Sequence, residues 1–355
     1  MTRLGSALEF VRSDRPGPGG SGARPYCSLP SWQAVCESSL GIGFSRYRIR
    51  RGQEDIGEFS CVALRSRLFG RRLISVPFSD GNGLTLLPGP DKDQGLRMEL
   101  PESLAFFLDR EAAAQGLDYV ELRGHVPWDS AIGEAFFTRR LPYVTFILDL
   151  SRGYAAVRQD YAGNLIKNLH KADKCVDIVE QGTPAMPDEL YRLYLAQMRK
   201  FGSPPLPIGY FSGLLACALA RLYVAKVQGR TAAFLMVLVS GQRMSAEINA
   251  SFAEFDPYFP KVRLFDHALR RACQEGLEEF DFMRTRKDSG VYWHKKKWGG
   301  VEHPIPYYLR ACGGRVPEIA DPEQGRYLLP RLCFKCMPLS LSAYVGPRIR
   351  SWIGK

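Results

Sequence analysis

Residues 275–300 read EGLEEFDFMRTRKDSGVYWHKKKWGG, and this stretch decides the fold class. Its first part places a glycine after a helical stretch, followed by acidic residues and an apolar run. That order is typical of a helix that ends and a strand that begins. The same order occurs at 115–123, as QGLDYVELR. The sequence therefore predicts a pattern that is repeated in the two halves of the chain.

Apolar periodicity predicts further elements on both sides of these two units. In the first half we expect helices at 30–40 and 101–116, and strands at 46–50, 57–64, 72–77, 118–123 and 144–150. In the second half we expect helices at 160–174, 187–201, 209–220 and 262–276, and strands at 175–180, 221–227, 231–240, 243–250 and 277–282. Strands that alternate with helices predict an α/β class with mixed sheets.

The length of 355 residues is sufficient for two domains of ordinary size. We expect the first domain at 26–153 and the second at 154–312. The Pro/Gly-rich composition near the start predicts a disordered segment at 1–25. The last part, 313–355, is predicted to be a basic extension.

The end of this extension, 331–355, contains five basic residues, no acidic residue and many Leu, Ile, Tyr and Trp. Such a segment could lie on an anionic membrane surface. The alternative is a C-terminal element that packs across the second domain, and we favour this alternative.

The bulk composition indicates a globular protein with anionic partners. The hydrophobic fraction is 45%, and the net charge of +11 favours phosphates, nucleic acid or an acidic membrane surface as partners. No apolar run reaches the ~20 residues of a membrane-spanning helix, and no signal peptide is visible. We therefore expect a cytoplasmic protein that could touch the inner face of the membrane peripherally.

Nine cysteines are scattered without regular spacing. The one tight pair, Cys333 and Cys336, lacks a second pair or histidines at matching spacing, so we expect no metal site and reduced thiols.

Three large aromatic residues, Tyr292, Trp293 and Trp298, surround the consecutive lysines 295–297. Rings that hold lysine stems lower the local dielectric, so the ammonium groups attract an anion more strongly. The alternative is that these lysines merely solvate a loop.

Four segments in order resemble the Fem-type branch of the GNAT acyltransferase superfamily, and most of all the FemAB-like proteins associated with exosortase/PEP-CTERM systems. The segments are SRLFGRRLISVPFSDGNG at 66–83, DYVELR at 118–123, LIKNLHKADK at 165–174, and the late one formed by DFMRT at 281–285, SGVY at 289–292 and KKKWG at 295–299. The resemblance implies two GNAT-like folds in tandem with a substrate channel between them. Characterised relatives transfer an amino acid from aminoacyl-tRNA to the stem peptide of a peptidoglycan precursor.

The resemblance also implies a catalytic residue, because Lys295 aligns with the family's catalytic lysine. We expect it to stabilise the oxyanion of acyl transfer without a covalent step. The chain departs from the family at two positions, with His294 in place of Phe and Met283 in place of Gly. The histidine adds a titratable nitrogen, and the methionine narrows the turn.

Further residues are predicted to bind substrate. Arg284 follows a strand end and could hold a phosphate or carboxylate, or it could pair with Asp281 or Asp288. Lys167 and Lys171 share a helix face and could meet an anion, or they could be simply solvated. The other predicted substrate contacts are Ser79 and Asp80, in a turn that could equally be a plain turn, and the rings of Tyr292 and Trp298.

Two motif absences limit the chemistry. The segment 259–264, FPKVRL, lacks the glycines of an acetyl-CoA loop, which makes acetyl-CoA doubtful as donor. No nucleophile elbow or catalytic cysteine signature is present. We therefore expect an acyl- or aminoacyltransferase that acts on an amine or hydroxyl of an anionic cell-envelope precursor, peptidoglycan or exopolysaccharide. It would have no tightly bound cofactor and would take aminoacyl-tRNA or acyl-CoA as co-substrate. The alternative is a non-catalytic, degenerate GNAT tandem that binds an anionic glycolipid or nucleic acid.

Overall fold

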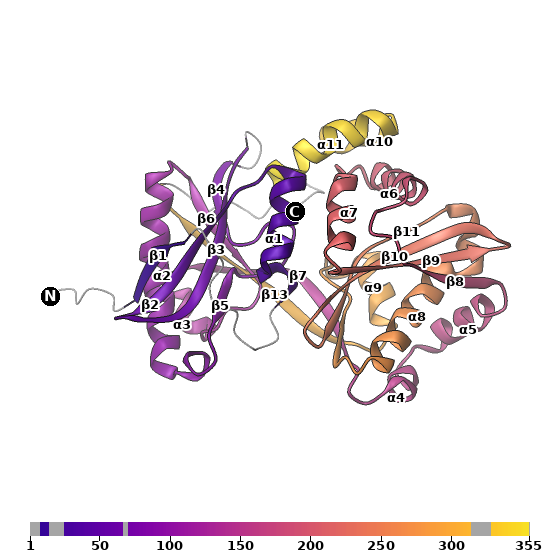
Figure 1. Ribbon diagram of the computed structural model, residues 1–355, viewed down its shortest axis with the longest axis horizontal. Helices are drawn as coiled ribbons and strands as arrows, with labels where there is room; N and C mark the ends of the chain where they lie inside the picture. Colours follow the sequence, from indigo (N-terminus) through magenta and orange to yellow (C-terminus); the bar gives the residue numbers. More distant parts are fainter. Residues whose placement is uncertain (1–7, 14–24, 67–69, 314–327, 355) are drawn as a thin grey trace. The chain divides into compact units, whose positions relative to one another are not determined.

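The computed structural model describes residues 8–13, 25–66, 70–313 and 328–354. It divides into two compact units (Figure 1). Unit 1 comprises 1–142, 305–320 and 351–355, and unit 2 comprises 143–304 and 321–350. The boundaries differ from the predicted 153/154 and 312/313 because the strands β7 (Thr138–Asp149) and β13 (Val301–Ala311) each have residues in both units.

Unit 1 is a mixed sheet with helices on both faces. Its strand order is β1-β2-β3-β4-β6-β13, with β5 paired to β3, and only β4 and β6 are parallel among these pairs. Figure 1 shows α1 and α2 on opposite faces of this sheet. The strands are β1 (Leu8–Arg12), β2 (Phe44–Arg51), β3 (Glu54–Ser66), β4 (Gly70–Ile74), β5 (Leu84–Leu86) and β6 (Tyr119–Arg123). The helices are α1 (Pro30–Leu40), α2 (Gln94–Ala114) and α3 (Ser130–Glu134), with short 3-10 turns at Tyr26–Ser28 and Pro90–Lys92.

Unit 2 repeats this architecture with the strand order β7-β12-β11-β10-β9-β8. In Figure 1, α4, α5 and α8 lie on one face of its sheet, and α6 and α7 lie on the other. The strands are β8 (Val176–Gln181), β9 (Ala220–Val227), β10 (Arg230–Ser240), β11 (Arg243–Ser251) and β12 (Glu279–Asp281). The helices are α4 (Tyr154–Gln159), α5 (Gly163–Ala172), α6 (Asp188–Phe201), α7 (Ile208–Ala216), α8 (Pro260–Gln274), α9 (Gly290–Lys296), α10 (Leu328–Cys336) and α11 (Leu339–Ile353), with a 3-10 turn at Ala253–Tyr258.

The predicted duplication is present in the structure. In unit 1, α2 joins the parallel strands β4 and β6, and in unit 2, α8 joins the parallel strands β11 and β12. Each helix ends at a glycine with positive φ, Gly116 at 61° and Gly276 at 73°. The next residue in each case donates back to the helix, from Leu117 N to the Ala112 carbonyl and from Leu277 N to the Ala272 carbonyl. Only glycine adopts this conformation at little cost, so the repeated glycine marks the repeated turn.

Apolar side chains fill the space between sheet and helices in each unit. In unit 2, the amphipathic α8 buries Leu264, Phe265 and Leu269 against the sheet. In unit 1, the buried stripe of α2 includes Leu100 and Leu104. These stripes have the spacing of three and four residues that the sequence predicts for a helix packed on a sheet.

Several elements differ from the sequence-based expectations, and three of them bear on the fold and the site. Leu8–Arg12 lies within the segment predicted to be disordered, but it forms strand β1 because it pairs with β2 and Phe10 stacks on Phe107 with ring centroids 4.4 Å apart. The predicted disorder of 1–7 and 14–24 falls outside the described residues. The lysines 295 and 296 lie on helix α9 rather than on a loop, and β13 forms where no strand was expected.

Candidate functional site

The chain makes a tight turn directly after β12. The carboxylate of Asp281 accepts a 2.5 Å hydrogen bond from the Thr145 hydroxyl and a 2.8 Å bond from the main-chain N–H of Met283. Met283 has a φ of +61°, a conformation in which a side chain is strained. The Gly that the related family carries at this position would adopt this positive φ without strain. Methionine therefore raises the free energy of the turn but leaves its shape unchanged.

Lys295 closes this turn from helix α9. The hydroxyl of Ser289 caps the helix by accepting from Tyr292 N over 3.1 Å, which fixes where α9 begins. One turn and a half later, the Lys295 ammonium donates to the carbonyl of Met283 over 2.8 Å and to that of Arg284 over 3.1 Å. The charge of this half-buried side chain is therefore held at a fixed position at the carboxyl end of β12.

The aromatic rings surround a different lysine from the one expected. The ammonium of Lys296 lies 5.1 Å from the ring centroid of Trp293 and 5.9 Å from that of Tyr292. Main-chain carbonyls rather than these rings hold Lys295. The expectation that rings position the catalytic lysine is thus wrong, because successive helix residues point about 100° apart and only one lysine can face the rings.

Two predicted substrate contacts are parts of the core. Trp298 has no exposed surface and packs against Tyr161 and Phe265, with ring centroids 5.0 and 5.7 Å away. Tyr292 is buried as well, and its hydroxyl donates to Glu302 over 2.6 Å. The prediction that these rings touch substrate does not fit their burial. They hold α9 against the sheet instead.

His294 takes the place of the family's Phe as an uncharged wall residue. Its ring lies 6.4 Å from the ring centroids of both Phe265 and Trp298. Burial, together with the nearby charges of Lys261, Lys297 and Lys295, lowers the pKa of His294 to about 4. At neutral pH the imidazole is therefore neutral and behaves as a ring of similar shape.

A cluster of lysines gathers at the first turn of α8. Phe259 precedes this helix with a φ of +57°, and the first bond into the helix runs from Arg263 N to the Phe259 carbonyl. The ammonium of Lys171, from α5, lies 5.7 Å from the Phe259 ring centroid. Lys261 lies two residues after Phe259, in the first turn of α8, so Lys171 and Lys261 form this cluster. Helix N-termini and nearby cations together favour anions.

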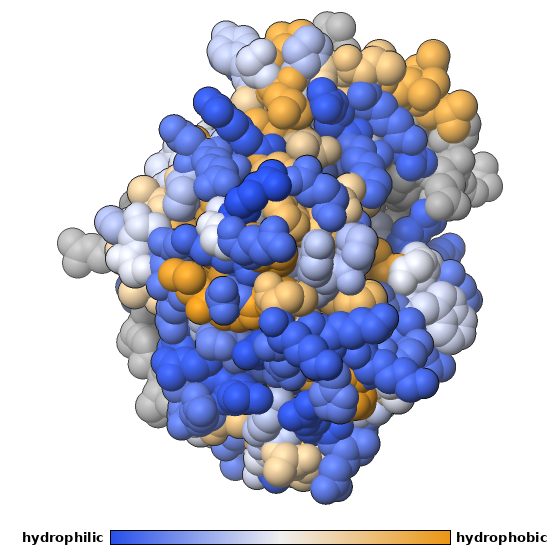
Figure 2. Space-filling model, turned by 90° about the vertical axis from the view of Figure 1, so that its right-hand side faces the viewer, coloured by the Kyte–Doolittle hydropathy of each residue, from blue (hydrophilic) through white to orange (hydrophobic). Residues whose placement is uncertain are grey.

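Lys167 lies one helical turn before Lys171 on α5, and both side chains are exposed. The sequence anticipated these two lysines but did not connect them with Lys261. Figure 2 faces unit 2 from the side on which α5 lies in Figure 1, and most of this surface below its top is hydrophilic. The lysine cluster at α8 is thus part of a polar face.

Arg284 lies in a second charged cluster. Its guanidinium is 5.7 Å from the ring centroid of Tyr143. It also contributes to the low pKa of Arg350, which burial lowers most, while the neighbouring Glu247 opposes the shift. Glu247 accepts from the Tyr210 hydroxyl over 2.9 Å, and Arg350 donates to the Ser203 hydroxyl over 3.3 Å.

Sequence reasoning missed Glu247 and Arg350. Glu247 is the one acidic residue of strand β11, RMSAEINAS, and Arg350 lies in the basic tail. A lone acid in an otherwise apolar and small-residue strand is the signal that could have found the first. No local sequence pattern predicts the burial of Arg350, because that burial depends on how α11 packs.

Ser79 and Asp80 lie in unit 1, whereas all other predicted site residues lie in unit 2. Ser79 is buried, and its hydroxyl accepts from Gly81 N over 3.1 Å. Asp80 accepts from the Tyr307 hydroxyl over 3.2 Å. The Ser79 contact is internal to the turn, and the Asp80 contact ties the turn to β13.

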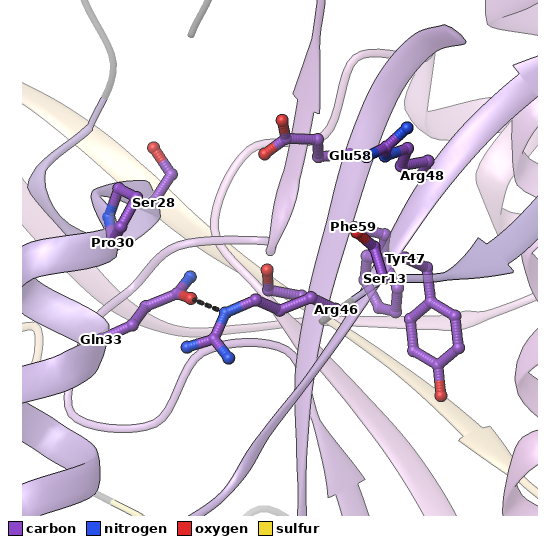
Figure 3. Close-up of a pocket in the computed structure, with 10 residues that line it drawn as sticks. Ser13, Ser28, Pro30, Gln33, Arg46, Tyr47, Arg48, Glu58 and Phe59 are labelled. Atoms are coloured by element: carbon purple, nitrogen blue, oxygen red, sulfur yellow. Dashed lines mark hydrogen bonds between the residues drawn. The ribbon is translucent and has the colours of Figure 1, made fainter. Parts of the chain in front are cut away.

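Unit 1 also contains a small pocket (Figure 3). Arg46 and Arg48 line it together with Glu58. Arg46 is held by Gln33 and Glu37 over 2.8 and 2.9 Å, and Arg48 pairs with Asp55 over 3.3 Å. The arginine charges are compensated within the protein, so the pocket gives no reason to expect an anion. Within the described residues, no group of three or more His, Cys, Asp or Glu is placed to hold a metal ion.

Residues 158–296 match the family model described as an acetyltransferase (GNAT) domain. This segment is a GNAT domain. It contains α5, α8 and α9, so the lysine cluster and Lys295 lie inside it. A comparison with curated proteins finds no match.

Solved structures show that the GNAT domain is one half of a tandem GNAT fold. A crystal structure of FemX superposes with a TM-score of 0.60 at 13% identity, covering 81% of this chain and 92% of that one. A tandem GNAT protein from the clavulanic acid biosynthesis pathway gives 0.52 at 13%, covering 87% and 99%. L-PGS from Bacillus licheniformis gives 0.55 at 13%, covering 96% and 100%. The predicted α/β class and the tandem GNAT fold are thereby confirmed, and the likeness to FemX is a likeness of fold. Such low identities carry no substrate with them.

Proposed function

We propose that this GNAT protein transfers an acyl or aminoacyl group to an amine or hydroxyl of a cell-envelope precursor, of peptidoglycan or of exopolysaccharide. The observation that carries the proposal is the position of Lys295. Its ammonium is fixed by two main-chain carbonyls at the carboxyl end of β12, inside the GNAT domain. A charge held in place before the reaction stabilises a developing oxyanion without reorganisation.

The proposed reaction forms one bond and breaks one. The acceptor nitrogen or oxygen attacks the acyl carbonyl carbon, and its electron pair forms the new C–N or C–O bond. The carbonyl oxygen becomes an oxyanion beside Lys295, and the intermediate then collapses. The C–O bond to the tRNA ribose, or the C–S bond to coenzyme A, breaks, and the proton lost by the acceptor ends on the leaving oxygen or sulfur.

The lysine cluster at the first turn of α8 supports an anionic donor. Lys171 and Lys261 lie there, with Lys167 one turn away on α5. Both aminoacyl-tRNA and acyl-CoA present phosphates that such a cluster binds. Because Phe259 and Pro260 stand where an acetyl-CoA loop has glycines, we favour aminoacyl-tRNA as donor. No tightly bound cofactor is part of the proposal.

Arg284 supports an acceptor that carries phosphate or carboxylate. Its planar guanidinium, 5.7 Å from the ring centroid of Tyr143, can bind such an anion bidentately. An envelope precursor linked through diphosphate has this chemistry. The exosortase-associated subgroup favours exopolysaccharide as readily as peptidoglycan. We place the reaction in the cytoplasm, where both donors are available.

The experiment is a transfer assay with purified protein and extracted envelope precursors. One arm contains charged tRNA and the other a panel of acyl-CoAs, and mass shifts on the precursors report transfer. Lys295→Ala is compared with Lys296→Ala, since the neighbouring lysine faces the rings instead of the turn. A mass shift that needs Lys295 but not Lys296 supports the proposal. Equal turnover in both variants overturns the role of Lys295.

A second candidate is a non-catalytic tandem that binds an anionic glycolipid or nucleic acid. The observation that favours it is that Lys295 donates to the protein's own carbonyls, as a purely structural lysine would. Precursor or tRNA binding without any mass shift, by protein whose fold is intact, would favour this candidate over transfer.

A further inference from the structure

In the C-terminal helix pair, α10, and α11 as far as Arg350, pack on unit 2, where the Arg350 side chain donates to the Ser203 hydroxyl over 3.3 Å. Ser342 and Gly346, four residues apart on α11, are buried, and a Cβ at Gly346 would overlap Pro205. Phe334 is the buried side chain of α10. The opposite faces of both helices are therefore directed away from the unit.

The outward face of α10 is apolar. Leu329, Leu332, Cys333 and Cys336 are all exposed and recur at helical spacings of three and four. Leu329 is 74% exposed and Leu332 48% exposed, so these leucines form an exposed apolar patch rather than a single exposed residue. Helices of a water-soluble protein normally turn such a stripe inward.

The outward face of α11 is also largely apolar, but it includes one basic side chain. Leu341, Tyr344 and Arg348 are exposed and lie three and four residues apart. The Arg348 guanidinium lies 4.2 Å from the Tyr344 ring centroid. Tyrosine and a long basic side chain together suit the boundary between water and lipid, where the ring enters the apolar layer and the charge meets head groups.

The positive charge of this surface favours an anionic partner over a second copy of the chain. The exposed cations of this surface are Lys335 and Arg348, with Arg331 partly exposed, and the segment 328–353 contains no acidic residue. A second copy of the chain that paired through this face would bring these like charges together, because a two-fold interface places the same patch on both sides. An anionic lipid surface complements both the cations and the leucines.

We infer that the C-terminal helix pair docks the protein on a membrane surface that contains anionic lipids. Figure 2 shows hydrophobic surface gathered at the top, the height at which α10 lies in Figure 1. No helix in the described part of the chain is long and apolar enough to span a bilayer, so the contact lies on the surface. This inference stands independently of acyl transfer.

The experiment is co-sedimentation of the full chain with vesicles. One vesicle type is phosphatidylcholine alone, and the other is phosphatidylcholine mixed with phosphatidylglycerol. The apolar variant carries Leu329→Ser and Leu332→Ser, and its control carries Met98→Ser and Phe106→Ser, two residues on α2 with 65% and 43% exposure. The charge variant carries Lys335→Gln and Arg348→Gln, and its control carries Arg97→Gln and Arg110→Gln on the same helix α2.

We expect binding only to the anionic vesicles, weakened by salt. Loss of two charges should weaken it about 25-fold, at about fivefold per charge. Loss of the two leucines should weaken it at least about tenfold. Both controls should bind as the unmodified chain does. Equal binding to both vesicle types, absent binding, or equal loss in the controls would overturn the inference. The inference would also be overturned if the unmodified chain sedimented as a dimer without lipid and the apolar variant sedimented as a monomer. The charge variant changes only exposed polar ends, so it tests the inference even if the leucine variant unfolds.

Discussion

The ammonium of Lys295 donates a 2.8 Å hydrogen bond to the carbonyl of Met283, the residue whose φ of +61° makes the turn after β12. One side chain thus fixes a strained turn and places a positive charge at the carboxyl end of β12. The same hydrogen bonds thus serve the structural and the proposed catalytic role of Lys295. The structural role affects the free energy of unfolding, whereas the catalytic role affects the transfer rate.

Replacing Lys295 by Ala should lower both stability and transfer. Hydrogen bonds from a charged donor contribute about 1.5–3 kcal/mol each, and partial exposure reduces this, so we expect a loss of about 1–3 kcal/mol in the free energy of unfolding. Loss of an oxyanion donor should lower the transfer rate about 100-fold or more. Urea unfolding and the transfer assay measure the two effects. Lys296→Ala should cost less than about 1 kcal/mol and leave transfer unchanged. A Lys295→Ala protein that loses stability but transfers normally would show a purely structural lysine.

Replacing Met283 by Gly should not destabilise the protein, although glycine usually does. The left-handed conformation costs a side chain about 1–2 kcal/mol, which roughly offsets the backbone entropy that glycine loses on folding. We expect a change between zero and about 1 kcal/mol of added stability, measured by urea unfolding. Val291→Gly, on the exposed side of α9, is the matched control and should cost up to about 1 kcal/mol. Equal losses at both positions would contradict the strain at Met283.

His294 should make the protein less stable in acid. Its folded pKa of about 4 lies below the ordinary value near 6.5, so the unfolded chain binds the proton first. The free energy of unfolding should therefore fall as the pH drops from about 6.5 to about 4, by up to about 3 kcal/mol. His294→Phe should remove this part of the decline. His267, whose burial also lowers its pKa to about 4, is present in both proteins and cancels in the comparison. Parallel decline of the two proteins would show that His294 titrates normally.

Replacing Lys171 and Lys261 by Ala should weaken donor binding while leaving the fold intact. Each lysine lost from a phosphate contact lowers the salt dependence of nucleic-acid binding by about one charge. Filter binding of charged tRNA at several salt concentrations measures this slope. Lys200→Ala is the control, because this exposed lysine lies on α6, across the sheet from α8. A slope that changes equally in the control would indicate diffuse attraction rather than a site at α8.

Much of the fold could be predicted from local sequence. The helix at 30–40 and the strands at 118–123 and 243–250 follow from periodicity and from the glycines that end helices. Leu8–Arg12 and Val301–Ala311 could not be predicted in the same way. Each is a strand only because a partner from elsewhere in the chain accepts its hydrogen bonds: β2 for the first, and β6 for the C-terminal part of the second.

The candidate site divides in the same manner. The sequence by itself determined which lysine to examine, because the order DFMRT, SGVY and KKKWG and its spacing are local properties. It also determined the repeated helix–glycine–strand unit, since a glycine at positive φ is a local demand of the backbone.

Only the tertiary structure decided what each side chain meets. It placed Lys295 on carbonyls and Lys296 on rings, buried Trp298, and brought Lys171 to the start of α8, where Lys261 lies. The physical reason is that such contacts join residues far apart in the chain, or depend on the rotation of a helix about its axis. Neither is encoded in the spacing of neighbouring residues.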